Sequence, residues 1–181
     1  HVSDNLTKRD FIAVGEIGID LYWDKTFLKQ QQDTFNQQIL LAKKYHLPIV
    51  IHCRNAFDEV FEILNDHKGD SLYGVFHCFS GTYQQALQAI ELNFMLGIGG
   101  VVTFKNGQID QFLDKIPLQR IVLETDSPYL APIPFRGKRN ESGYLKLINQ
   151  KVSEIYGMTN DEIAKITTGN ALSVFKTNLK Y

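Results

Sequence analysis

The sequence predicts an α/β fold of repeated strand–helix units, and a (β/α)8 TIM barrel is favoured over an open, doubly wound sheet. Short apolar runs alternate with longer helical patterns from the N-terminus to about residue 126. The runs are continuous, as expected of parallel strands that are covered on both faces. Side chains suited to metal binding follow four of the five predicted strands, and a barrel can bring four strand ends to one site.

The apolar pattern predicts five strands with helices between them. The first strand, 11–15, is followed by a helix over 26–45 in which apolar residues recur at helical spacing. The second strand, 47–51, carries Pro48 at its beginning, where a missing N–H is least harmful. The later strands are predicted at 72–76, 94–98 and 120–123, the helices at 56–65 and 83–92, and a weakly patterned stretch at 108–113.

The part of the chain after the last strand is predicted to be helical. One helix covers about 144–156. A capping box over Thr159 to Glu162 predicts the start of a second helix, because its side chains can satisfy the first free backbone N–H groups. A final helix is predicted through residues 171–175.

Composition is typical of one soluble globular domain, residues 1–181, with 44% hydrophobic and 22% charged residues. The 19 basic and 20 acidic residues give a net charge of −1, so any phosphate-binding surface must be local. The apolar runs are shorter than the roughly 18 residues of a membrane span, so no membrane partner is expected. Only two cysteines are present, which is typical of a cytoplasmic protein.

Four residues with metal-binding side chains stand where predicted strands stop: Glu16, His52, His77 and Asp126. Parallel strands direct their carboxyl ends to one face, so we expect these side chains to meet there. Taken singly, each residue has a structural alternative, such as a turn former or a histidine satisfied in the core. Their coincidence favours a divalent cation, because unpaired buried charges are unfavourable.

The mixed nitrogen and oxygen ligands suit zinc, manganese, nickel or ferrous iron better than calcium or magnesium. A bridging carboxylate allows two ions, which can activate water and clamp a phosphodiester. Cys53 and Cys78 follow the histidines directly, so they point to the opposite strand face and are predicted to be small buried residues. Glu124, two residues before Asp126, faces the same way as Asp126 and is expected to orient a ligand histidine.

Basic residues near the predicted strand ends are candidate ligands for phosphate. They are Arg54, Lys105 and, in the loop after the last strand, Arg136, Lys138 and Arg139. A short basic run is often only a solvated loop, but this loop should overhang the metal-bearing face, where it can neutralise phosphate oxygens. Tyr22 and Trp23, in the loop after the first strand, either stack on a base or cover the core.

Five sequence blocks resemble, in order and spacing, the signature blocks of the TatD-type metal-dependent deoxyribonucleases. They are residues 14–20 (VGEIGID), 51–56 (IHCRNA), 76–81 (FHCFSG), 124–132 (ETDSPYLAP) and 136–141 (RGKRNE). The resemblance implies an amidohydrolase-like (β/α)8 barrel that hydrolyses phosphodiester bonds of DNA with one or two divalent ions, among zinc, manganese, nickel, magnesium and iron.

The resemblance also implies a role for each candidate residue. Glu16 resembles the bridging carboxylate, and His52 and His77 resemble the two histidines of one metal. Asp126 resembles a carboxylate of the other metal that also handles the proton of the attacking water. Glu16 and Asp126 are therefore the expected catalytic residues.

The sequence departs from the family pattern in two places. The family carries a His-x-His pair on its first strand, and this sequence contains no such pair. By the resemblance, the chain begins just before the fourth strand, so we expect an N-terminally incomplete domain that carries about the last five βα units. Ser142 and Gly143 stand where the family usually continues with proline, at the start of a helix.

The leading hypothesis is a cytoplasmic metal-dependent hydrolase that resembles a 3′-exonuclease and acts on DNA or nucleotide phosphodiesters with metal-activated water. One alternative is a small-molecule amidohydrolase, which would cleave cyclic amides or esters and would have no use for the basic loop. Another is a catalytically idle chain that binds nucleic acid or a partner, which the missing His-x-His pair favours.

Overall fold

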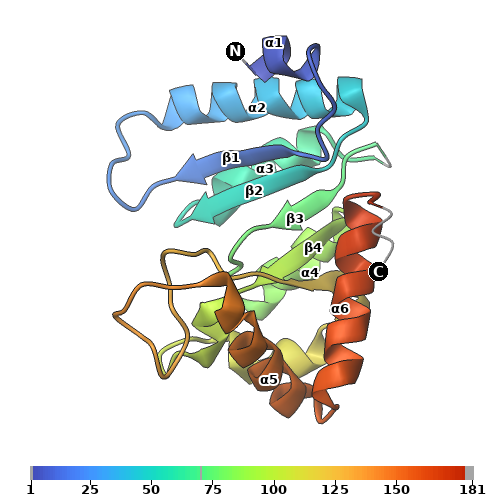
Figure 1. Ribbon diagram of the computed structural model, residues 1–181. Coiled ribbons are helices and arrows are strands. Elements are labelled where there is room, and N and C mark those ends of the chain that lie inside the picture. The colour runs from blue at the N-terminus through green and yellow to red at the C-terminus, as the bar shows by residue number, and fades with distance from the viewer. Residues whose placement is uncertain (1, 70, 178–181) are drawn as a thin grey trace. The chain divides into compact units, whose positions relative to one another are not determined.

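Figure 1 shows the computed structural model of the chain, which describes residues 2–69 and 71–177. The chain groups into two compact units. The first unit is formed by the chain up to His77, residues 91–94 and the chain from Leu172 onward, and the second by residues 78–90 and 95–171. None of the helices in the described residues is long and apolar enough to cross a lipid bilayer.

The first unit consists of parallel strands with helices packed on them. Its elements are helix α1 (Val2–Leu6), strand β1 (Val14–Asp20), helix α2 (Leu28–Tyr45), strand β2 (Ile49–Arg54), helix α3 (Phe57–Asp66) and strand β3 (Gly74–Phe76). β2 pairs in parallel with β1 and with β3. α2 packs on β1, and α3 packs on β1 and β2 (Figure 1, blue to green). Ile19, Ile39 and Ile51, one each from β1, α2 and β2, are completely buried in this core.

The second unit contains most of the remaining elements. They are helix α4 (Tyr83–Glu91), strand β4 (Phe94–Ile98), strand β5 (Ile121–Leu123), helix α5 (Leu145–Tyr156) and helix α6 (Asn160–Val174). β4 and β5 are parallel and pair from Leu96 opposite Ile121 to Ile98 opposite Leu123. α5 packs on β5 and buries Ile148 and Val152. Short 3-10 helices fill the weakly patterned stretch before β5, over Ile109–Gln111 and Leu113–Lys115.

The order of strands and helices predicted from the apolar pattern is confirmed, and the strand predicted at 94–98 coincides with β4. The capping box is confirmed by reciprocal hydrogen bonds, in which the Thr159 N–H donates to Glu162 and the Glu162 N–H to the Thr159 hydroxyl. The prediction of two helices after the capping box was wrong, because α6 is continuous from Asn160 to Val174. A helix tolerates an internal glycine such as Gly169 at a cost of about 1 kcal/mol. The short helix α1 was not predicted.

The prediction that strands stop at Glu16 and at His52 was also wrong. β1 begins at Val14 and continues past Glu16 to Asp20, and β2 continues past His52 to Arg54. Pairing holds the two strands together over this added length, up to Asp20 opposite Arg54. The continuous apolar run marks only the part of a strand that is buried on both faces, so it misses a strand end that carries polar side chains.

Two glycines let the strands of the first unit come together closely. A Cβ atom added to Gly18 of β1 would lie 1.9 Å from the carbonyl oxygen of His52 in β2, and one added to Gly74 of β3 would lie 1.9 Å from that of Ile49. Their φ angles are +145° and +157°, which only glycine adopts without strain. Gly18 therefore sets the approach of β1 to the backbone of His52.

We expect Gly18→Ala to lower the free energy of unfolding by about 1–3 kcal/mol, because the added Cβ meets backbone and the φ angle becomes strained. Urea unfolding followed by circular dichroism measures the change. Gly169→Ala is the matched control. A Cβ added at Gly169, which lies in α6, meets nothing within 4 Å, so this variant should be as stable as the unchanged protein or more stable. Equal stability of Gly18→Ala and the unchanged protein would contradict the close approach.

Candidate metal centre

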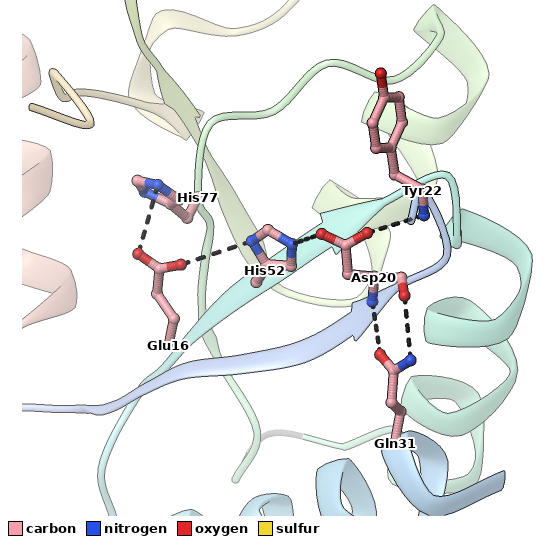
Figure 2. Close-up of polar contacts among 6 residues, drawn as sticks. All are labelled: Glu16, Asp20, Tyr22, Gln31, His52 and His77. Atoms are coloured by element: carbon pink, nitrogen blue, oxygen red, sulfur yellow. Dashed lines mark hydrogen bonds and ion pairs between the residues drawn. The ribbon is translucent and has the colours of Figure 1, made fainter. Parts of the chain in front are cut away.

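The carboxylate of Glu16 lies between two histidines in the first unit (Figure 2). Its Oε2 is 3.6 Å from Nδ1 of His52, and its Oε1 is 3.5 Å from Nε2 of His77. The two histidines come from β2 and from the residue directly after β3, and Glu16 comes from β1. The structure thus brings together three of the four residues that the sequence predicts as metal ligands.

A β-bulge gives Glu16 its place. Gly15 pairs with Val50 and Ile17 pairs with Ile51, so Glu16 is the extra residue that has no opposite partner in β2. The peptide bond between Gly15 and Glu16 is cis. A bulge redirects a side chain that regular alternation would place elsewhere, and here the Glu16 carboxylate reaches both histidines.

Asp20 holds His52 from the other side of the imidazole ring. Its Oδ2 is 2.9 Å from Nε2 of His52, and its Oδ1 accepts a hydrogen bond of 2.9 Å from the Tyr22 N–H (Figure 2). Gln31 of α2 holds the backbone of the same residue, since its side-chain amide accepts from the Asp20 N–H at 2.8 Å and donates to the Asp20 carbonyl at 3.1 Å. Asp20 is therefore fixed at both its side chain and its backbone.

The surroundings of Asp20 favour its ionised form. Burial raises the pKa of this carboxyl, but hydrogen bonds from the Tyr22 N–H and from His52, with the charges of His52 and Arg54, outweigh burial and lower the pKa below its usual value. The ionised carboxylate therefore stabilises the fold above the unfolded pKa of about 3.9, and this contribution is lost as the pH falls through the folded pKa.

The donor set fits a divalent cation. A carboxylate only accepts hydrogen bonds, so the bond between Asp20 and His52 requires a hydrogen on Nε2 of His52. When the ring is neutral, its Nδ1 is then a lone pair directed at Glu16. A divalent cation between Nδ1 of His52 and the Glu16 carboxylate would satisfy both of these acceptors. Ligand atoms bonded at about 2.0–2.1 Å to one tetrahedral ion lie about 3.4 Å apart, close to the spacing from Glu16 to each histidine.

Glu16, His52 and His77 are not gathered as closely as the ligands of a metal site. In residues 2–69 and 71–177, no group of three or more His, Cys, Asp or Glu side chains has the arrangement of a metal site. Binding of a metal by Glu16, His52 and His77 therefore stays a prediction that rests on their chemistry and spacing.

Asp126 lies in the second unit, in a loop that a buried asparagine holds together. The side-chain amide of Asn140 donates to the carbonyls of Thr125, at 2.5 Å, and of Tyr129, at 2.6 Å. The Asn140 N–H donates to the carbonyl of Pro128, and Asn140 is only 2% exposed. These bonds bracket Asp126, whose backbone has a φ angle of 54°.

Glu124 and the cysteines are placed as follows. Glu124 accepts a 2.6 Å hydrogen bond from the N–H of Cys78, the residue directly after His77, and its action on a histidine ring stays a prediction. Both cysteines are half-buried and carry thiols outside disulfides. Burial raises the pKa of the Cys53 thiol to about 12, so this side chain stays neutral, but it is half-buried and not fully buried as the sequence predicts.

The predicted phosphate ligands are all exposed: Arg54, Lys105, Arg136, Lys138 and Arg139. In the second unit, the Arg136 guanidinium lies 3.6 Å from the centroid of the Phe104 ring, and the Lys138 ammonium lies 6.0 Å from that of Phe135. In the first unit, Arg54 lies over an aromatic ring of the loop after β1. Contact of these residues with phosphate stays a prediction.

Sequence reasoning missed two residues that position the others, Asp20 and Asn140. Asp20 stands in the block with Glu16 and lies four residues after it, so an even spacing on one strand was an available signal. The bulge at Glu16 breaks this parity, and only the structure shows the contact with His52. Asn140 bonds mainly to backbone carbonyls, which leave no signal in the sequence.

The chain is similar along nearly its whole length to known metal-dependent hydrolases. The family model "TatD related DNase" matches residues 2–176. The chain is 44% identical to the uncharacterized metal-dependent hydrolase YabD of Bacillus subtilis, with 92% of this chain and 66% of that protein covered. It is 33% identical to the uncharacterized metal-dependent hydrolase YcfH of Escherichia coli K12, with 91% and 62% covered. It thus spans less than two thirds of the length of these relatives.

Solved structures confirm the predicted fold class. The crystal structure of YjjV, a TatD homolog from Escherichia coli K12, matches with a TM-score of 0.86 and 32% identity over 92% of this chain and 64% of that chain. A hydrolase TatD family protein from Entamoeba histolytica matches with a TM-score of 0.78 over 95% of this chain and 65% of that chain, and at 22% identity it supports the fold alone. The prediction of a partial (β/α)8 barrel agrees with these matches.

We expect Asp20→Asn to weaken the affinity for Mn²⁺ or Zn²⁺ by about 10- to 100-fold, as is typical for the loss of a carboxylate that orients a ligand histidine. Asparagine has one acceptor oxygen, which cannot replace both carboxylate oxygens that accept from the Tyr22 N–H and from Nε2 of His52, and it carries no charge. The His52 ring is therefore held less firmly in the tautomer that leaves Nδ1 bare. Isothermal titration calorimetry measures the affinity. Asp33→Asn removes an exposed carboxylate of α2 that pairs with Lys29, and it should leave the metal affinity unchanged. Equal affinity in both variants would contradict the role of Asp20.

We expect Asn140→Ala to lower the free energy of unfolding by about 1–3 kcal/mol, because two carbonyls lose their donor. The loop around Asp126 should also exchange its amide hydrogens faster, most clearly at Tyr129, whose N–H donates to the Asp126 carbonyl. Hydrogen exchange followed by mass spectrometry measures this. Asn106→Ala, at an exposed position of the second unit, serves as the control. Unchanged exchange in this loop would show that Asn140 does not hold it.

Proposed function

The chain belongs to the TatD related DNase family, and we propose that it acts as a metal-dependent hydrolase on the phosphodiester bonds of DNA. The observation that carries this proposal is the carboxylate of Glu16 between the imidazoles of His52 and His77, at 3.6 Å and 3.5 Å. This donor set suits a divalent ion of the first transition row. The curated relatives are named uncharacterized metal-dependent hydrolases, which supports the coarser part of the proposal, a metal-dependent hydrolase.

Each residue has a role in the proposed reaction. Glu16, His52 and His77 would hold a divalent ion, and Asp20 keeps the His52 ring in the tautomer that this requires. When bound, the ion would supply a Lewis acid that activates water at neutral pH. Asp126 is proposed to take up the proton of the attacking water, and Asn140 keeps its loop in place.

The substrate contacts, the direction of cleavage and the location in the cell are also proposed. Exposed basic side chains of the second unit, Arg136, Lys138 and Arg139, are proposed to neutralise phosphate oxygens. Removal of nucleotides from a 3′ end follows from the family resemblance. A cytoplasmic location is proposed from the low cysteine content of the sequence, which has two cysteines.

We expect Asp126→Ala to lower the rate of DNA cleavage in Mn²⁺ at least about 100-fold, because a positioned proton acceptor contributes 10²–10⁴ to such a rate. The assay follows release of nucleotides from an end-labelled oligonucleotide by the purified protein, and EDTA should abolish it. Asp114→Ala removes an exposed carboxylate elsewhere in the second unit and should cleave normally. Circular dichroism should show the same fold in all three proteins.

Undiminished cleavage by Asp126→Ala would overturn the proposed role of that residue. Binding of DNA without cleavage in any divalent ion would overturn the hydrolase and support the idle DNA-binding chain. Cleavage of a cyclic amide or ester, with DNA untouched, would support the amidohydrolase instead.

A further inference from the structure

Two adjacent aromatic side chains of the first unit lie open to solvent beside the candidate metal centre. Trp23 is 80% exposed and Tyr22 is 50% exposed, so the alternative that they cover the core is excluded. Their rings meet edge to face, with centroids 4.7 Å apart and planes at 87°. Exposing large rings to water is unfavourable, and exposed apolar patches often mark binding sites.

A guanidinium group completes this surface. The Arg54 guanidinium lies 3.7 Å from the centroid of the Tyr22 ring and 5.7 Å from that of Trp23, and Arg54 is itself exposed. We call Tyr22, Trp23 and Arg54 the aromatic platform. A planar cation on an aromatic face keeps its N–H groups at its edges, so the platform offers flat apolar faces and positive charge in one place.

Backbone contacts fix the aromatic platform relative to the candidate metal centre. Arg54 stands opposite Asp20 in the pairing of β1 with β2, and the N–H of the buried Leu21 donates to the Arg54 carbonyl at 2.9 Å. The Tyr22 N–H donates to the same Asp20 carboxylate that holds His52 (Figure 2). The aromatic platform is therefore linked to His52 through the Asp20 carboxylate and through β2, which carries both His52 and Arg54.

We propose that the aromatic platform stacks an unpaired base of single-stranded DNA and so places the adjoining phosphodiester at the candidate metal centre. This inference rests on the proposed function. Aromatic rings and guanidinium planes stack on any base, because every base has a π face, and Arg54 adds attraction for the phosphate backbone. Paired bases in a duplex present only their edges, so the platform selects unpaired ends.

The sequence supplies its own reporter, because Trp23 is the only tryptophan. The experiment follows its fluorescence in EDTA, without metal and therefore without cleavage, while a thymidine oligonucleotide is added. We expect strong quenching by this oligonucleotide and little quenching by an abasic oligonucleotide of the same length and charge. Equal quenching by both oligonucleotides would show that only the phosphate backbone is bound. No quenching by either would show that the platform does not bind single-stranded DNA. Each of these results would overturn the proposal.

Variants separate stacking from charge. Tyr22→Leu and Arg54→Lys should each weaken binding of the thymidine oligonucleotide at least about five-fold, because stacking is lost while Arg54→Lys keeps the charge. Lys29→Gln, at an exposed position of α2, should bind normally. Trp23→Leu removes the reporter, so its affinity is measured by anisotropy of a labelled oligonucleotide. Normal affinity in all three platform variants would overturn the proposal.

The outcome is separable from that of the proposed function. DNA cleavage in Mn²⁺ together with equal quenching by abasic DNA would refute the aromatic platform and leave the hydrolase standing. Base-dependent quenching without cleavage would refute the hydrolase and keep the platform as a binding site for single-stranded DNA.

Discussion

The hydrogen bond between Asp20 and His52 is the contact on which the rest of the first unit's site depends. It sets which ring nitrogen of His52 carries hydrogen and therefore which one faces Glu16. It can form only because β1 and β2 remain paired beyond their apolar runs and because Gly18 lets β1 lie against the His52 carbonyl. The same carboxylate binds the Tyr22 N–H, so the histidine and the aromatic loop share one anchor.

The sequence predicted most of the fold because its strands are short apolar runs with helices between them. It also predicted the meeting of Glu16, His52 and His77, because parallel strands present their polar ends on one face. It could not predict the bulge at Glu16, since a bulge depends on pairing between strands and leaves the apolar pattern unchanged. For the same reason the predicted strands β1 and β2 were too short at their carboxyl ends, because the pairing continues to Asp20 and Arg54, which carry polar side chains.

Asn140 illustrates a second kind of information that the sequence lacks. The block that contains it was identified from its basic residues, yet these are exposed while Asn140 is buried and makes the bonds that shape the loop. Its partners are the carbonyls of Thr125, Pro128 and Tyr129, groups that every residue type carries. A sequence can therefore show that a loop is polar without showing which of its residues gives it a defined conformation.

The contact of Gln31 with Asp20 also satisfies backbone groups of β1 that do not pair with β2. The Leu21 N–H bonds to β2, so the N–H and carbonyl of Asp20 point to the opposite edge of the strand, where an incoming strand would bind. The Gln31 amide occupies both groups and so imitates the backbone of a neighbouring strand. A side chain of α2 thus supplies at Asp20 the two hydrogen bonds that a neighbouring strand would supply elsewhere.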